Sequence, residues 1–312
     1  MRIFIAGATG VLGRRLVRLA ADRGHEAVGL ARTRERAEVV ARHGGTPVVA
    51  SLFDADALAH AIAGSDVVVH GATSIPTETT YRPESWAMND RIRREGTTAL
   101  TQASARAGVR RYIQQSIVWV VQPPGGAAYD EASPPNAAGE LQSAVDAERI
   151  AAEAASRQMT VAVLRCGAFY AADAGHTLMA RDMLKARKLP VIGRGRTIWA
   201  WVHADDVARA FLAAAEGSGT GIFHVVDDDP SPAGDVLDRF AELLGAPRPR
   251  RVPAFVARLF AGAQAVKYLT TSMNTTNHRF KSTFRWTPAY PSYREGLTQV
   301  VQQWQSGQGV KP

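Results

Sequence analysis

Apolar and polar positions alternate in a regular rhythm along the first half of the chain. Short apolar runs, which are typical of buried strands, lie at 2–6, 27–30, 47–49 and 67–70. Segments with apolar residues three and four positions apart, which are typical of helices, fill the intervals at 11–23, 34–43 and 55–63. This alternation of strands and helices predicts an α/β fold, a doubly wound parallel sheet of Rossmann type.

The rhythm continues toward the middle of the chain and then loosens. We expect a long helix at 86–107, a strand at 111–115, a helix at 139–157 and a strand at 161–165. Beyond Tyr170 the elements are mixed and include an apolar helix near 255–269. The pattern therefore predicts a Rossmann domain over residues 1–170, with about 195–228 returning to it, and a smaller C-terminal lobe made mainly of residues 171–312.

A glycine-rich turn joins the first predicted strand to the first predicted helix. Its glycines allow a tight exit from the strand, a close approach of the backbone to a pyrophosphate and close packing of the helix on the sheet. The free N–H groups and the dipole of the following helix favour an anion. This context predicts a dinucleotide site, and the residues that we expect to bind the cofactor there are Gly7, Thr9, Gly10, Val11, Leu12 and Gly13.

Ligands of such sheets bind beyond the carboxyl ends of the strands. Five residues follow predicted strands and should converge there, namely Gly7, Arg32, Leu52, Ala72 and Ser116. The stretch 28–34 has an arginine where NAD-binding proteins place a carboxylate for the ribose 2′-hydroxyl. Because a guanidinium fork fits a 2′-phosphate, we predict NADP(H) as cofactor, with Arg32 as its main contact and Arg14 or Arg36 in support.

Composition and charge restrict the class of protein. The 312 residues are 46% hydrophobic, enough for a substantial core, and the formal charge of +8 comes mainly from arginine. Acidic and basic residues are interspersed and no nucleic-acid motif accompanies them, so we expect no nucleic-acid partner. No apolar run reaches the roughly 18 residues that span a bilayer, and the first strand begins at once, so we expect a soluble cytoplasmic protein without a membrane segment.

Candidate metal ligands are sparse. The single cysteine, Cys166, is expected to be a small buried hydrophobe, and no spacing of cysteines and histidines resembles a zinc site. His203, Asp205 and Asp206 are close together in the sequence, but Asp205 lies where a helix begins and is expected to cap it. We therefore predict no metal site.

Several later segments, taken in order, resemble the extended short-chain dehydrogenase/reductase superfamily of epimerases, dehydratases and reductases that use NAD(P). The matching segments are 54–58, 64–72, 89 with 96–97, 107–112, 164–170, 201–208 and 286–288 with 295–297. The resemblance runs nearly from end to end. It implies a nicotinamide cofactor, a small-molecule substrate held by the C-terminal lobe, and a homodimer formed through the helices at 86–107 and 139–157.

The resemblance fails at the catalytic residues. In the superfamily a tyrosine, and a lysine four positions later that lowers its pKa, carry out the proton transfer. This chain has no lysine before Lys185, and alignment on Glu148 places Glu140 and Ala144 at the two positions. Ser116 matches the hydroxyl that polarises a substrate oxygen. The candidate catalytic residues are therefore Ser116, Glu140, Tyr81 and His176, with Tyr129 as a further alternative.

Three functions remain open. The first is an NADP(H)-dependent oxidoreductase, or an epimerase/dehydratase-like enzyme, that acts on a carbonyl or hydroxyl group with a non-standard proton donor. The second is a non-redox cyclase or isomerase with a structural cofactor, and the third is a silent NADP(H)-binding regulator resembling the NmrA-like branch. Five aromatic residues of the C-terminal lobe are expected either to line an apolar pocket or to fill the core, namely Trp199, Trp201, Phe255, Phe260 and Tyr268. Taken together they favour an aromatic or polyketide-like substrate over a nucleotide sugar.

Overall fold

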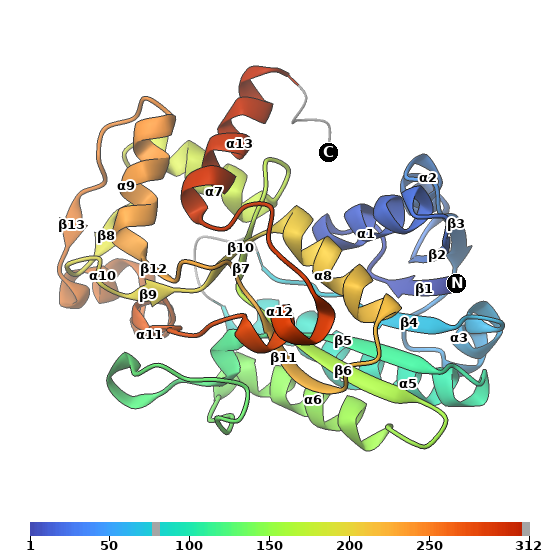
Figure 1. The fold of residues 1–312 in the computed structure, drawn as a ribbon. Helices are drawn as coiled ribbons and strands as arrows, with labels where there is room; N and C mark the ends of the chain where they lie inside the picture. The colour runs from blue at the N-terminus through green and yellow to red at the C-terminus, as the bar shows by residue number, and fades with distance from the viewer. Residues whose placement is uncertain (77–81, 308–312) are drawn as a thin grey trace.

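The computed structural model describes residues 1–76 and 82–307 of the chain. Its centre is a seven-stranded parallel sheet in the order β11-β6-β5-β4-β1-β2-β3 (Figure 1). The strands are β1 (Arg2–Ala6), β2 (Glu26–Ala31), β3 (Thr46–Val49), β4 (Val67–His70), β5 (Arg111–Ile117), β6 (Thr160–Cys166) and β11 (Gly221–Val225). The predicted α/β class with a doubly wound parallel sheet is confirmed.

Helices cover both faces of this sheet (Figure 1). One face carries α1 (Val11–Asp22), α2 (Arg34–Arg42) and α8 (Ala204–Glu216), and the other carries α3 (Ala55–Ile62), α5 (Thr97–Arg106) and α6 (Gln142–Glu153). Successive side chains of a strand point to opposite faces, so Ile3 and Ile5 pack under α1 while Phe4 packs under α3. Both faces of the strands are buried, which explains why they read as nearly continuous apolar runs.

The long helix expected at 86–107 is interrupted. It consists of a 3-10 turn (Pro83–Trp86), α4 (Ala87–Arg91), a π-helical turn (Ile92–Gly96) and α5. At the end of the π-helical turn, Gly96 lies against Leu52, and a Cβ there would come within 2.9 Å of a Leu52 methyl carbon. The break thus lies where this helix passes the segment that follows β3.

Short strands and helices make up the C-terminal lobe. Strand β7 (Ala168–Tyr170) pairs with β10 (Trp201–His203), β8 (Val191–Ile192) with β13 (Arg251–Val252), and β9 (Ile198–Trp199) with β12 (Ser231–Pro232). Helices α7 (Gly175–Lys185), α9 (Ala233–Leu243) and α13 (Tyr293–Gln305) enclose a core around Tyr170 and Phe240. Helix α12 (His278–Phe284) packs against β11.

The apolar helix expected near 255–269 is two helices, α10 (Ala254–Ala261) and α11 (Ala263–Thr270). Gly262 separates them with a φ of 82°, a conformation that a helix cannot contain. Phe255 and Phe260 are 70% and 87% exposed. The expectation that they line a pocket or fill the core is wrong, because α10 directs them outward. No helix of the described residues is long and apolar enough to span a bilayer.

Candidate functional site

The turn between β1 and α1 accepts only glycine at its two tightest points. Gly7 has a φ of 88°, and a Cβ on it would lie 2.6 Å from the backbone nitrogen of Ala72. A Cβ on Gly13 would lie 2.0 Å from the Gly7 carbonyl oxygen. Gly10 stands at the N-cap of α1 and supplies no side-chain cap for the first N–H groups. This backbone cradle fits a pyrophosphate, and Gly7 and Ala72 are neighbours as expected.

Arg32 follows β2 and is exposed at the carboxyl edge of the sheet. Among the described residues it makes no hydrogen bond or ion pair. Arg14, by contrast, pairs with Asp173 at 2.5 Å, so its charge is already compensated. Thr33 accepts a hydrogen bond from the backbone nitrogen of Arg36 and caps α2. Of the three arginines expected near a 2′-phosphate, Arg32 is therefore the one that lies at the strand end with no carboxylate partner among the described residues.

A buried ionic group lies between β5, β6 and α6. Arg165 is fully buried and donates from Nε and Nη2 to the two oxygens of Glu148, at 2.8 and 2.7 Å. The hydroxyl of Ser116 donates to Glu148 Oε1 at 2.5 Å. Ser116 lies directly opposite Arg165 in the register of the two strands. Ser116 is thus anchored to an ion pair, a role that the sequence analysis did not assign to Glu148 or Arg165.

His224 and Tyr129 lie beside this group. Burial, reinforced by the positive charge of Arg165, lowers the pKa of His224 to about 3, so its ring is neutral. Its Nδ1 is 2.7 Å from the hydroxyl of Thr275, which donates to the carbonyl of Tyr129. The Tyr129 hydroxyl donates to the Val118 carbonyl at 2.9 Å, and burial raises the pKa of Tyr129. Both groups are therefore held in their neutral forms.

The expected proton donors do not form one cluster in the described part of the chain. Ser116 is buried at the sheet, whereas His176 is exposed on α7, where its Nε2 contacts the Phe169 carbonyl. Tyr81 lies outside the described residues, and so does the side chain of Glu140. Ala144, at the expected lysine position, is buried with Trp119 and Leu141.

Four aromatic residues meet beyond the carboxyl end of β5, and we call them the aromatic wall: Trp119, Trp199, Trp201 and Tyr268. The rings of Trp119 and Tyr268 are stacked, with centroids 5.5 Å apart, and Trp199 meets Trp119 edge-on at 5.6 Å. The indole nitrogens of all three tryptophans are buried, and no described residue accepts a hydrogen bond from them. A ligand with oxygen acceptors would satisfy such donors.

The start of α8 corrects one expectation. The cap is His203, whose Nδ1 accepts from the backbone nitrogen of Asp205 at 3.2 Å, whereas the Asp205 carboxylate accepts from Arg15 at 2.5 Å. Burial lowers the pKa of His203 to about 4, which keeps Nδ1 available as an acceptor. Asp205 was expected to cap because it lies where the helix begins, but its side chain is directed toward Arg15 of α1. Asp206 accepts from the backbone nitrogens of Ala289 and Tyr290.

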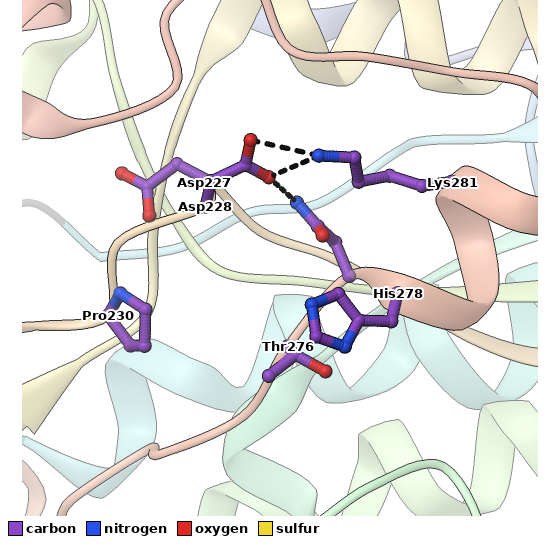
Figure 2. A pocket seen from close by; sticks show the side chains of 7 residues that line it. Asp227, Asp228, Pro230, Thr276, His278 and Lys281 are labelled. Atoms are coloured by element: carbon purple, nitrogen blue, oxygen red, sulfur yellow. Dashed lines mark hydrogen bonds and ion pairs between the residues drawn. The ribbon is translucent and has the colours of Figure 1, made fainter.

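A separate pocket of about 260 Å³ opens where β11 ends (Figure 2). Asp228 holds Lys281 at 2.9 Å and Asn277 at 2.7 Å, as the dashed lines show. The carboxyl of Asp227 points away from this group, and burial raises its pKa to about 9. None of the residues expected to bind the cofactor or substrate lines this pocket.

Comparison with protein families gives a match over residues 3–225 to the "NAD dependent epimerase/dehydratase family". A 3-diazoavenalumate denitrifying reductase from a Streptomyces species is 36% identical over 308 residues, covering 95% of this chain and 99% of that protein. A 4-hydroxy-2-methyl-3-oxo-4-farnesyl-3,4-dihydroquinoline-1-oxide ketoreductase from Stigmatella aurantiaca is 26% identical, covering 88% of this chain and 80% of that protein.

Solved structures share the fold at lower identity. A human epimerase family protein with NADPH superposes with a TM-score of 0.83 at 21% identity, covering 97% of this chain and 99% of that chain. A dTDP-glucose 4,6-dehydratase from Streptomyces venezuelae with NAD superposes with a TM-score of 0.81 at 22% identity, covering 99% and 98%. The neighbours thus share the whole architecture, including the C-terminal lobe.

Proposed function

Because this chain belongs to the NAD-dependent epimerase/dehydratase family, we propose that it is an NADP(H)-dependent reductase of a small, conjugated aromatic substrate. The observation that carries the proposal is the aromatic wall, which lies where β5 ends and where ligands of such sheets bind. The reductases among its relatives support hydride transfer, and they make a structural cofactor or a silent regulator less favoured.

The backbone cradle of Gly7, Gly10 and Gly13 would hold the cofactor pyrophosphate, and Arg32 would bind a 2′-phosphate. An exposed arginine at the end of β2, with no carboxylate partner in the described part of the chain, favours NADP(H) over NAD. The superposed structures contain NADPH in one case and NAD in the other, so the choice between the two cofactors rests on Arg32.

The residues at the expected tyrosine and lysine positions favour a substrate whose reduction requires no proton from a side chain of the protein. A carbonyl that accepts a hydride becomes an alkoxide and requires a proton. The expected tyrosine and lysine positions are occupied by Glu140 and Ala144, so no ammonium on α6 can lower a phenol pKa. An aromatic diazo substrate avoids this requirement, and the relative that is named for one is the reductase with 36% identity.

Bound reduced nicotinamide would supply a hydride and become oxidised. For a diazonium substrate, this hydride would form the new ring C–H bond while the C–N bond breaks and dinitrogen leaves with the two electrons of that bond. Around this exchange the chain's own residues bind and orient. The aromatic wall would hold the ring. The Glu148–Arg165 pair would fix Ser116 at the floor of the site.

The test is to follow NADPH absorbance and dinitrogen release with 3-diazo-4-hydroxybenzoate as probe, and with acetophenone as a ketone. We expect enzyme-dependent oxidation of one NADPH per dinitrogen for the diazo compound, corrected for the reaction without enzyme. NADPH oxidation with the ketone but not with the diazo compound would contradict the diazo substrate and would favour carbonyl reduction, as the name of the Stigmatella relative indicates. Binding of NADPH without oxidation by either compound would overturn the reductase function.

A further inference from the structure

A buried cation lies near the aromatic wall and was not expected from the sequence. Arg93 is 7% exposed, although the residues around it in the sequence form a charged helix surface. Its Nη1 donates to the hydroxyl of Ser143 at 3.3 Å. Ser143 directly precedes Ala144, which the alignment on Glu148 places at the position of the superfamily's lysine. The guanidinium therefore approaches the same part of α6 from the opposite helix.

The π-helical turn explains how this happens. Residues 92–96 form one wide turn between α4 and α5, so the side chains on either side differ in register from those of a continuous α-helix. Arg93 points inward, whereas its neighbour Arg94 is 43% exposed and pairs with Asp146 at 2.6 Å. Such turns interrupt regular hydrogen bonding, and they are found frequently at functional sites.

Arg93 also lies close to the aromatic wall. Its hydrogen-bond partner Ser143 directly precedes Ala144, which packs in one cluster with Trp119 and Tyr268. Burial lowers the pKa of Arg93, and the carboxylates of Asp90 and Glu148 act on that pKa in the opposite direction. Tyr268 stacks on Trp119, and Ala144 packs in the same cluster. Arg93, the stacked rings of Trp119 and Tyr268, and the Trp119 indole N–H, from which no described residue accepts a hydrogen bond, are thus grouped around the beginning of α6.

We propose that Arg93 binds the carboxylate of the substrate while the ring lies against the aromatic wall. The proposal rests on the proposed function and narrows its substrate class to anionic aromatic compounds. A guanidinium removed from water binds such a group through short, charge-assisted hydrogen bonds. The Trp119 N–H offers the anion a further donor, since no described residue accepts from it. Arg93 is then a specificity-determining residue supplied by the π-helical turn.

The test compares an acid with its neutral ester. The probes are 4-hydroxycinnamate and its methyl ester, titrated by calorimetry into the enzyme saturated with NADP⁺, so that no turnover occurs. We expect the wild type to bind the acid at least about 10-fold more tightly than the ester. Arg93→Met should weaken binding of the acid by about 10- to 150-fold and binding of the ester by less than about 3-fold.

The matched control is Arg94→Met, which removes the same charge from the same turn on its exposed side, and it should leave both affinities unchanged. Equal affinity of the wild type for acid and ester overturns the proposal without any variant. Equal weakening of both probes by Arg93→Met also overturns it, because the residue would then be structural. If the wild type binds the acid more tightly than the ester but oxidises NADPH with neither the diazo compound nor the ketone, the anion site stands and the reductase function fails.

Discussion

Single residues determine the cofactor choice that we propose. Replacing Arg32 by alanine removes the guanidinium at the end of β2, so NADPH should bind about 10- to 150-fold more weakly while NADH affinity changes little. The measurement is the dissociation constant of each nucleotide by fluorescence titration. Arg34→Ala is the control, since Arg34 is also exposed but is the first residue of α2 and not the residue at the end of β2. Equal affinity of the wild type for NADPH and NADH would contradict the assignment.

The Arg32 prediction needed only the sequence, because the end of a strand can be located from its apolar run. The Glu148–Arg165 pair did not follow in the same way. An arginine inside the apolar run of β6 signals a buried charge, which must find a carboxylate partner. Which of the chain's carboxylates lies within 2.8 Å of it depends on how α6 crosses the sheet, and that is a tertiary property.

At the scale of an element, α1 packs so closely on the glycine-rich turn that a single added carbon atom would disturb the contact. A Cβ on Gly13 would meet backbone atoms at 2.0 to 2.7 Å, and backbone cannot move aside as a flexible side chain can. Gly13→Ala should therefore displace the start of α1, destabilise the protein by about 1–3 kcal/mol and weaken NADPH binding. Urea unfolding and nucleotide titration measure the two effects.

The control for this variant is Gly108→Ala, at a glycine with φ of 69° and no atom within 4 Å of an added Cβ. It should cost about 1 kcal/mol through backbone strain alone and leave NADPH affinity unchanged. If both alanine variants bound NADPH like the wild type, the close approach of α1 to the turn would have no part in cofactor binding.

The ends of most elements agreed with the periodicity because caps and glycines mark them locally. The helix expected at 86–107 shows the limit of this approach. Most of its residues favour a helix, and although Gly96 is a weak helix former, nothing in the apolar pattern indicates a π-helical turn. The π-helical turn lies where this helix packs against Leu52 and α6. Because of this turn, the side chain of Arg93 faces inward and that of Arg94 faces outward.

Across the whole molecule, buried ionisable groups predict a pH optimum for stability. Burial lowers the pKa values of His70 and His203 to about 4 and that of His224 to about 3. The unfolded chain binds these three protons below its histidine pKa of about 6.5, so stability falls as the pH falls from there toward 4. Asp227 acts in the opposite direction, because its pKa of about 9 in the folded protein keeps it protonated at pH values where it ionises in the unfolded chain. Its contribution to the free energy of unfolding is therefore lost as the pH rises from about 4 to 9.

Below pH 6.5 the loss of stability caused by the three histidines outweighs the gain from Asp227. Above pH 6.5 only the contribution of Asp227, of these four residues, still changes with pH. The melting temperature should therefore be highest near neutral pH and fall on both sides. His224→Gln should flatten the acid side, Asp227→Asn should flatten the alkaline side, and His60→Gln on the surface should change neither. A melting temperature that rises steadily from pH 6.5 to 9 would refute the assignment of a protonated Asp227.

The sequence by itself determined the sheet, the glycine cradle and the arginine at the end of β2, because each depends on residues close together in the chain. The same holds for the family, whose motifs follow one another in order. Tertiary structure alone decided what surrounds the substrate space. The hydroxyl of Ser116 donates to a buried ion pair, Phe255 and Phe260 face solvent, and Arg93 points inward to Ser143. These outcomes depend on contacts between elements far apart in sequence, where side-chain direction is set by packing and not by local periodicity.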